Sequence, residues 1–382
     1  MNTAALRERC AQRLFGAVEQ TGRLSAFVGL DGFVDEIIHV VDKRQSAENF
    51  QRLTGIGPFA ARIAAAAGQS TNIELVNHVT KLGGNGPIMA NALASFGLRV
   101  TYLGTLGYPT IHPIFEEFGK RAQIHSIAEP GHTDALEFDD GKIMMGKHYT
   151  LKEVNWENIK ARFGREKFAR NFQGADLVGF VNWTMLPYMS DVWKSLLKEL
   201  CPALTPRRRL LFFDLADPEK RTPEDIRRAL DLIIGFQKFF EVVLGLNEKE
   251  AFEIGEVLGL QHTDHSKEGL QKLTAELSLK LPIESVVVHP VAYALAGSKG
   301  AVSLVEGPFI ARPTITTGAG DHFNSGFCLG KLLGLENELC ILTGVTTSGF
   351  YVRTARSPSV LELVEMLRNW PDSNDQQEGA AA

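Results

Sequence analysis

The stretch "TITTGAGDHFNSGF", residues 314–327, joins a glycine-rich turn to the start of an apolar, helically spaced segment. We expect the helix to begin near Gly318 and to end near Gly334, where a glycine suits the last turn. The first N–H groups of a helix lack partners within the helix, and the helix dipole is positive there. A turn built of Gly318, Ala319 and Gly320 could therefore hold an anion such as a phosphate.

Asp321, which directly follows this turn, has two interpretations. As a capping carboxylate it would stabilise the helix by roughly 0.3–1 kcal/mol. Beside a bound polyphosphate it would suffer repulsion, which is tolerated where the carboxylate accepts a proton from an attacking hydroxyl. The turn alone does not decide between a helix start and a phosphate site with a base beside it.

Two further turns allow the same choice between a structural and a functional role. "KLGGNGPIMANALASFG" (81–97) places Gly83 and Gly84 before a predicted helix, and Asn85 offers both a donor and an acceptor to sugar hydroxyls. "GLNEKEAF" (245–252) fits a helix-capping box of Asn247 and Glu250. At the carboxyl end of a strand, the same pair could also hold the waters of a Mg²⁺ ion.

A fourth turn, "VGLDGFVDEI" (28–37), contains Asp31 and Asp35 just after the first apolar run. Buried carboxylates require partners, and the vicinal hydroxyls of a sugar would supply them. Both aspartates would be unremarkable as solvated loop residues, so either, both or neither could bind a substrate.

Short apolar runs alternate with amphipathic segments along the chain, which predicts a mainly parallel sheet covered by helices on both faces. The clearest runs are "LSAFVGL" (24–30), "RVTYLGTL" (99–106), "ADLVGFVN" (175–182), "RLLFFDL" (209–215), "FEVVLGLN" (240–247) and "IESVVVH" (283–289).

Two segments do not fit as parallel core strands. "DALEFDDGKIMMGKHY" (134–149) is typical of a hairpin around Asp140-Gly141, and "DEIIHVVDK" (35–43) is a short apolar segment bounded by charge. We expect them to form a small antiparallel lid, with a helical insertion at about 46–71. Residues 1–370 are then one domain, followed by a disordered tail at 371–382.

Composition excludes several classes of protein. The 382 residues include 40 Lys and Arg against 45 Asp and Glu, and no basic block favours nucleic-acid binding. No apolar run is long enough to span a membrane. The four cysteines are widely spaced and suggest neither disulfides nor a metal site. We therefore expect a cytoplasmic protein.

Taken in order, the four turns resemble those of the ribokinase-like (PfkB) carbohydrate kinases. Thr317 to Phe323 is similar to the C-terminal signature of that family. The resemblance implies a ribokinase-like three-layer α/β/α fold, with Mg²⁺ as cofactor and ATP as co-substrate. Roles are also implied: Asp321 as catalytic base, the amides of Gly318, Ala319 and Gly320 as anion hole, Asn247 and Thr317 at the nucleotide phosphates, Glu250 at Mg²⁺ through water, and Asp31, Asp35, Gly83, Gly84 and Asn85 at the substrate.

The chain departs from the family pattern at Ile88, at Tyr108-Pro109 and in "HPVAYALAGSKG" (289–300). We expect ATP-dependent phosphorylation of a hydroxyl on a small carbohydrate or a nucleoside-like substrate. The alternatives are a binding protein of the same fold that has lost turnover, and an oxidoreductase. The latter is disfavoured because no GxGxxG follows the first strand. Two exposed lid strands would offer an edge to a second copy, so a homodimer is expected.

Overall fold

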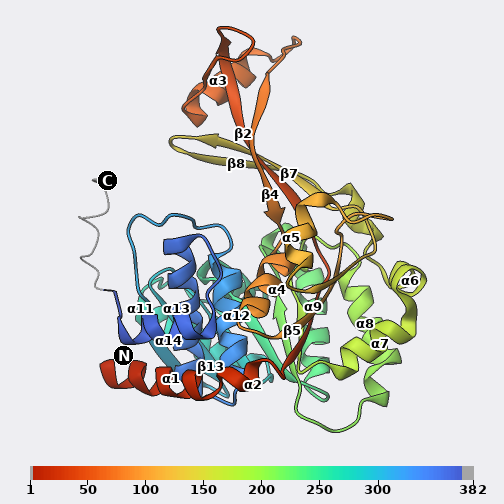
Figure 1. Cartoon of the computed structure of the whole chain (residues 1–382), viewed down its shortest axis with the longest axis vertical. Helices are drawn as coiled ribbons and strands as arrows, with labels where there is room; N and C mark the ends of the chain where they lie inside the picture. Colours follow the sequence, from red (N-terminus) through yellow and green to blue (C-terminus); the bar gives the residue numbers. More distant parts are fainter. Residues whose placement is uncertain (1–2, 372–382) are drawn as a thin grey trace.

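The computed structural model describes residues 3–371, whose strands form a large sheet and a small one (Figure 1). Within that range the large sheet has nine strands in the order β14-β13-β12-β11-β10-β9-β1-β5-β6. Their bounds are β1 (Ser25–Gly29), β5 (Arg99–Gly104), β6 (Gln123–Ser126), β9 (Leu177–Phe180), β10 (Leu210–Asp214), β11 (Glu241–Leu246), β12 (Ser285–Val288), β13 (Tyr293–Ser298) and β14 (Ala301–Glu306). The six predicted apolar runs are the parallel strands β1, β5, β9, β10, β11 and β12.

Helices cover both faces of this sheet. Side chains alternate along each strand, so on β10 Leu211 and Phe213 enter one apolar cluster while Leu210 and Phe212 enter the other. The first cluster packs against α6 (Trp156–Asn158), α7 (Arg165–Gly174), α8 (Met189–Glu199), α9 (Pro223–Phe236), α10 (Glu248–Val257) and α11 (Lys267–Lys280). The second packs against α1 (Ala4–Gly16), α2 (Val18–Thr21), α4 (Asn85–Ser95), α5 (Glu116–Gly119), α12 (Ala319–Leu332), α13 (Asn337–Thr354) and α14 (Val360–Arg368). The predicted three-layer ribokinase-like architecture is confirmed.

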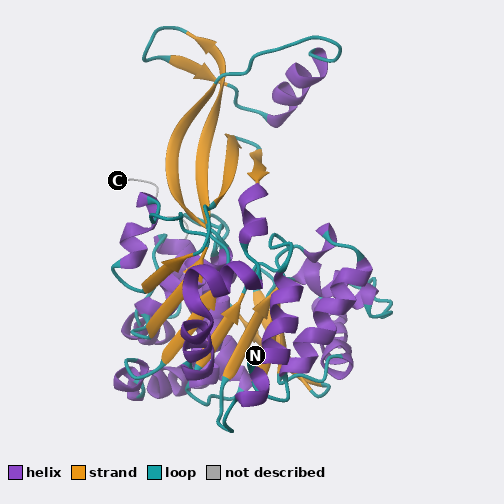
Figure 2. Cartoon of the chain, turned by 90° about the vertical axis from the view of Figure 1, so that its right-hand side faces the viewer, coloured by secondary structure: helices purple, strands orange, loops and turns teal. Residues whose placement is uncertain are grey.

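The small sheet stands away from the body as a twisted ribbon with one helix near its end (Figure 2). It consists of β2 (Phe33–Arg44), β3 (Phe50–Arg52), β4 (Leu75–Gly83), β7 (Gly131–Phe138) and β8 (Gly141–Lys147), and it carries α3 (Ile56–Ala65). A separate apolar cluster that includes Val40, Phe59 and Phe138 joins the helix to these strands. The segments expected in the lid lie in β2, β7 and β8.

The small sheet is mixed, whereas the sequence predicted an antiparallel one. β2 pairs with β3 and β4 antiparallel and β7 pairs with β8 antiparallel, but β2 and β7 are parallel. Between them the chain returns along β4 into the body, so β7 leaves the body in the same direction as β2. β3 falls inside the segment expected to form a helical insertion, which also contains α3, and β4 was not predicted.

The strand order indicates where a ligand would bind. The chain moves outward from β1 to β5 on one side and to β9 on the other, so the order reverses beside β1. Ligands of open parallel sheets bind at such a switch point, beyond the carboxyl ends of the strands. The lid rises from this edge, because β2 continues the chain shortly after β1 ends.

The remaining sequence expectations concern the cysteines, the membrane and the tail. Cys10, Cys201, Cys328 and Cys340 are all buried free thiols. None of the helices in residues 3–371 combines the length and apolar character that crossing a membrane requires. Apart from Pro371, the predicted tail at 371–382 lies outside the described residues.

Candidate active site

A cavity of about 430 Å³ opens at the carboxyl edge of the large sheet, at the base of the lid. Residues from all four turns singled out in the sequence line it: Asp35, Gly84, Asn85, Asn247, Glu250, Gly318, Gly320 and Asp321. Gly83 ends β4 directly against the carboxylate of Asp35. Asp31, Ala319 and Thr317 do not line this cavity: Ala319 faces an adjoining cavity, and Thr317 faces one behind the turn.

The glycine turn begins α12 in the way that an anion site requires. Gly318 is the N-cap and has φ 91°, a conformation that glycine adopts without strain. The amide of Ala319 donates to the carbonyl of Thr316 at 3.1 Å. Among the described residues no such backbone partner takes the amides of Gly318 and Gly320. Both of these N–H groups are available to an anion.

Two aromatic side chains hold the turn from behind. Tyr351 donates its hydroxyl to the carbonyl of Thr317 at 2.9 Å, and His322 Nδ1 lies 2.7 Å from the carbonyl oxygen of Gly318. The two rings stack with centroids 3.6 Å apart, and His322 Nε2 lies 2.9 Å from Ser357 Oγ. Burial lowers the pKa of His322 to about 4, so the imidazole is neutral near pH 7.

Asp321 lies in the first turn of α12 and is 6% exposed. Burial raises its pKa well above the ordinary value, and the nearby carboxylates of Asp214 and Asp31 raise it further. Asn85 Nδ2 donates to Asp321 Oδ1 at 3.1 Å, which favours the ionised form. The side chain is thus a buried carboxylate that one neutral amide holds at the cavity wall.

Asp31 is wholly buried and serves as a brace. Its carboxylate accepts hydrogen bonds from the backbone amides of Gly86 (2.9 Å) and Asn85 (3.0 Å), and from the side-chain amide of Asn182 (2.8 Å) and the hydroxyl of Tyr102 (3.2 Å). Burial raises its pKa to about 6, although these bonds oppose the rise. Four donors bond to the Asp31 carboxylate, and two of them are the first backbone amides of α4. Asp31 therefore fixes the start of α4.

Of the two aspartates that follow β1, Asp35 is the one that faces the cavity. It lies in β2, 8% exposed, with its pKa raised by burial against the opposing effects of a hydrogen bond to Thr133 and the charge of Lys81. The sequence left the choice between Asp31 and Asp35 open, and the geometry leaves Asp35 able to reach a ligand.

Asn247 and Glu250 form the capping box that the sequence allowed. Glu250 N donates to Asn247 Oδ1 at 2.9 Å, and Asn247 N donates to Glu250 Oε2 at 2.8 Å. The second carboxylate oxygen, Oε1, accepts from the amide of Asp217 at 2.9 Å. Burial raises the pKa of Glu250, and its backbone hydrogen bonds oppose this. Helix capping and a place at the cavity are therefore compatible.

The loop after β10 adds residues that the sequence analysis missed. Ala216 and Asp217 both have φ 57°, in the left-handed region, and the amide of Ala216 donates to Asp214 Oδ1 at 2.9 Å. Asp214 is buried, and burial together with the charge of Glu250 raises its pKa well above the ordinary value. Among the described residues Lys220 is the one lysine or arginine lining the cavity, and it pairs with Asp217 at 3.0 Å.

Asn182 is another missed residue, at the end of the run "ADLVGFVN". It has φ 61°, is 3% exposed and lines the cavity. Its Nδ2 donates to Asp31, while its Oδ1 has no hydrogen-bond partner among the described residues. Polar residues at the ends of predicted parallel strands were the signal that could have identified both Asn182 and Asp214.

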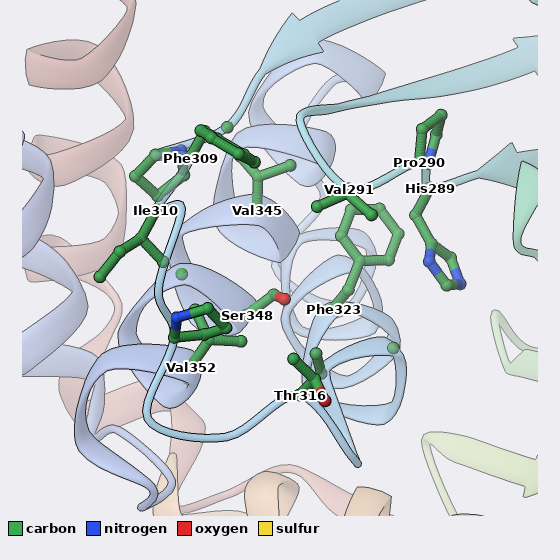
Figure 3. Close-up of a pocket in the computed structure, with 16 residues that line it drawn as sticks. His289, Pro290, Val291, Phe309, Ile310, Thr316, Phe323, Val345, Ser348 and Val352 are labelled. Carbon is green, nitrogen blue, oxygen red and sulfur yellow. The ribbon is translucent and has the colours of Figure 1, made fainter. Parts of the chain in front are cut away.

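A second cavity, of about 260 Å³, adjoins the first and is mostly apolar (Figure 3). Both cavities are lined by His289 and Gly320. Its other walls include Val291 and Phe309 from the loops, Phe323 from α12, and Val345 and Ser348 from α13. A flat apolar group could enter it while an attached anion reaches the turn at Gly318 to Gly320.

Of the departures from the family pattern, only the segment beginning at His289 lines these two cavities. Ile88 packs behind Gly318, where a Cβ on the glycine would lie 3.2 Å from the Ile88 side chain. "HPVAYALAGSKG" supplies His289 and Pro290 to the apolar cavity and then forms β13 and the turn into β14. Tyr108 lies on the surface beside Arg162. None of these residues blocks the cavity that contains Asp321.

The fold and the site define a ribokinase-like carbohydrate kinase, and comparisons with known proteins agree. The family model for prokaryotic ketohexokinase matches residues 1–370. The ketohexokinase of Haloferax volcanii is 29% identical over 337 residues, which is 88% of each chain. The chain belongs to the prokaryotic ketohexokinase family and is a carbohydrate kinase.

Solved structures support the same fold. The ribokinase of Cryptococcus neoformans var. grubii in complex with ADP has a TM-score of 0.61 at 16% identity, covering 90% of this chain and 98% of its own. The Arabidopsis thaliana ribokinase complexed with ribose and ATP has a TM-score of 0.60 at 16% identity, with the same coverage. At this identity the likeness concerns the fold.

His322 predicts a pH dependence of stability. Its folded pKa of about 4 lies below the ordinary 6.5, so the unfolded chain binds a proton first as the pH falls. The stabilisation is complete above about pH 6.5 and is lost between about 6.5 and 4. We expect urea unfolding of His322→Gln to lose less stability than the parent between pH 7 and pH 5. Equal losses in both, with the exposed His265→Gln as control, would contradict this.

Proposed function

We propose that residues 1–370 act as one kinase domain that transfers the γ-phosphoryl group of ATP to a hydroxyl of a ketohexose. One observation carries this proposal: Asp321, Asn85 and the glycine turn line a single cavity together with Asp35, and an apolar cavity meets it at Gly320. The name of the Haloferax relative supports a ketohexose as substrate.

The sugar would bind on the β1 and β9 side of the cavity. Asp35 and Asn85 would contact its hydroxyls, and Asn182 Oδ1, which has no partner among the described residues, would accept a hydrogen bond from a further hydroxyl. This wall requires glycine at positions 83 and 84. A Cβ at Gly83 would overlap Asp35, and Gly84 has φ 101°, which residues with a side chain rarely adopt. Asp31 supports the wall by fixing the start of α4.

The nucleotide would bind on the opposite side. Its base would enter the apolar cavity beside Phe323 and Val345, and its phosphates would pass over the amides of Gly318 and Gly320. Thr317 and Ala319 would shape this turn, since the Ala319 amide is used within it. The Cryptococcus ribokinase is in complex with ADP and the Arabidopsis ribokinase with ATP, which supports an adenine nucleotide as the ligand of this half.

In the transfer step the hydroxyl oxygen of the sugar bonds to the γ-phosphorus, and Asp321 accepts the proton that this hydroxyl loses. The bond from that phosphorus to the bridging oxygen breaks, and its electron pair leaves with ADP. The amides of Gly318 and Gly320 stabilise the negative charge on the transferred group. Lys220, which lines the larger cavity on the loop after β10, would approach the same charge when it turns from Asp217.

The acidic groups of the cavity fit Mg²⁺ held through water. Residues 3–371 contain no group of three His, Cys, Asp or Glu side chains that could hold a metal directly. The charge of Glu250 nevertheless raises the pKa of Asp214, a repulsion that a divalent cation nearby would relieve. Asn247 and Glu250 would hold the waters of the ion. When bound, Mg²⁺ neutralises phosphate charge during transfer.

Asp321→Asn tests the catalytic base. Asparagine keeps the shape but accepts no proton, so we expect kcat for a ketohexose to fall by about 10²–10⁴ while binding of an ATP analogue is retained. The exposed Asp191→Asn should keep full activity. Similar turnover in variant and parent would refute the assignment. A parent that turns over no sugar would favour the binding-protein alternative.

Ser348→Phe tests the nucleotide half. The side chain would fill the apolar cavity, so we expect the KM for ATP to rise at least tenfold with little change in the KM for sugar. Steady-state kinetics with each substrate varied in turn measures this. An unchanged KM for ATP, or an equal rise for the sugar, would place the base elsewhere.

The lid predicts a homodimer. Leu75 and Val79 on β4 and Met145 on β8 are 44%, 44% and 52% exposed, and the sheet has free edges. We expect sedimentation of the parent as a dimer and of Leu75→Lys/Val79→Lys as a monomer. Leu361→Lys, which changes an exposed leucine on α14, should remain dimeric. A monomeric parent would contradict the prediction.

A further inference from the structure

A basic hollow of about 550 Å³ lies at the amino ends of the parallel strands, opposite the active site. It is lined by Arg99 at the start of β5, by Arg121 just before β6, and by Arg170 in α7. The floor is formed by the first residues of β1, from Ser25 to Phe27. The length of the strands separates this hollow from the cavity that contains Asp321.

Within residues 3–371 the three guanidinium groups are not tightly paired with acids, although the charge of Arg121 acts on the Glu117 carboxylate. Among the described residues none of them forms an ion pair, although most other arginines of the chain do so. Arg99 donates to the carbonyl of Arg23 at 2.9 Å, and Arg121 donates to Asn91 Oδ1 at 3.2 Å. Both partners are neutral. No side-chain hydrogen bond or ion pair of Arg170 occurs within residues 3–371.

The rest of the lining suits an anion. Gln123, Asn171 and Thr101 can donate hydrogen bonds, and no aspartate or glutamate lines the hollow. Two acids close to the lining residues have other partners: Asp176 accepts from Ser25 and Arg207, and Glu117 pairs with Lys120 while also interacting electrostatically with Arg121. In a chain of net charge −5, three arginines around one hollow without a carboxylate form a local exception.

We propose that this hollow binds a phosphate group, either as inorganic phosphate or as part of a phosphorylated small molecule. Guanidinium groups bind phosphate oxygens through paired N–H donors. Several guanidinium groups together favour a doubly charged phosphate as ligand over a singly charged carboxylate. The hollow has room for a sugar phosphate. The hollow opens at the amino ends of the strands, whereas the active site lies at their carboxyl ends. Its ligand is therefore not the sugar or nucleotide that reacts at Asp321.

The test measures phosphate binding by calorimetry while a non-hydrolysable ATP analogue and a ketohexose fill the active site. We expect the parent to bind one inorganic phosphate per chain, and Arg121→Gln/Arg170→Gln to bind it at least tenfold more weakly. Arg227→Gln/Arg228→Gln is the matched control, because it removes the same charge from exposed positions on α9. Thermal unfolding verifies that each variant is folded, and Arg170→Gln alone, which breaks no hydrogen bond, should still weaken binding.

A second titration with glucose 6-phosphate identifies the source of the phosphate. Tighter binding than inorganic phosphate assigns the hollow to a phosphorylated metabolite, and equal or weaker binding assigns it to free phosphate. The proposal is overturned if the parent binds neither probe, if the arginine variants bind as the parent does, or if the control loses binding equally. Loss of kinase activity is not a readout, so failure of the proposed function leaves this test unaffected.

Discussion

Burial of several carboxylates at one edge of the sheet is the constraint on which the site depends. Asp31, Asp214, Glu250 and Asp321 are each less than a tenth exposed, and burial is the largest cause of the raised pKa of each. Such groups are tolerated where hydrogen bonds replace water. The loops at the carboxyl ends of the strands supply those hydrogen bonds. The conformation of these loops and the burial of the carboxylates therefore depend on each other.

The first three carboxylates brace the backbone, and the fourth, Asp321, is the one that we propose as the catalytic base. Asp31 fixes the start of α4, Asp214 and Glu250 fix the left-handed loop at Ala216-Asp217, and Glu250 also caps α10. Asp321 receives one side-chain amide, from Asn85. Substrate and nucleotide would therefore meet rigid walls around a buried carboxylate that accepts one side-chain hydrogen bond.

Sequence reasoning predicted the parts of this structure that follow from local pattern. Buried parallel strands are continuous apolar runs, and Asp140-Gly141 marked the β7–β8 turn. β4 was missed because most of its side chains are exposed, and the parallel pairing of β2 with β7 depends on the path of the chain between them. The role of Asp31 could not be separated from that of Asp35, since only tertiary packing shows which donors surround each. Lys220 and Asn182 lie outside the motifs and were missed for that reason.

The central claim is that the buried Asp321 is the base that accepts the proton of the attacking hydroxyl. The pH dependence of kcat for a ketohexose, compared between the parent and Asp321→Asn, measures this directly. The account predicts that kcat of the parent falls on the acidic side as Asp321 becomes protonated at its raised pKa, and that this acidic limb is absent from the residual activity of Asp321→Asn. The same acidic limb in both proteins would contradict it.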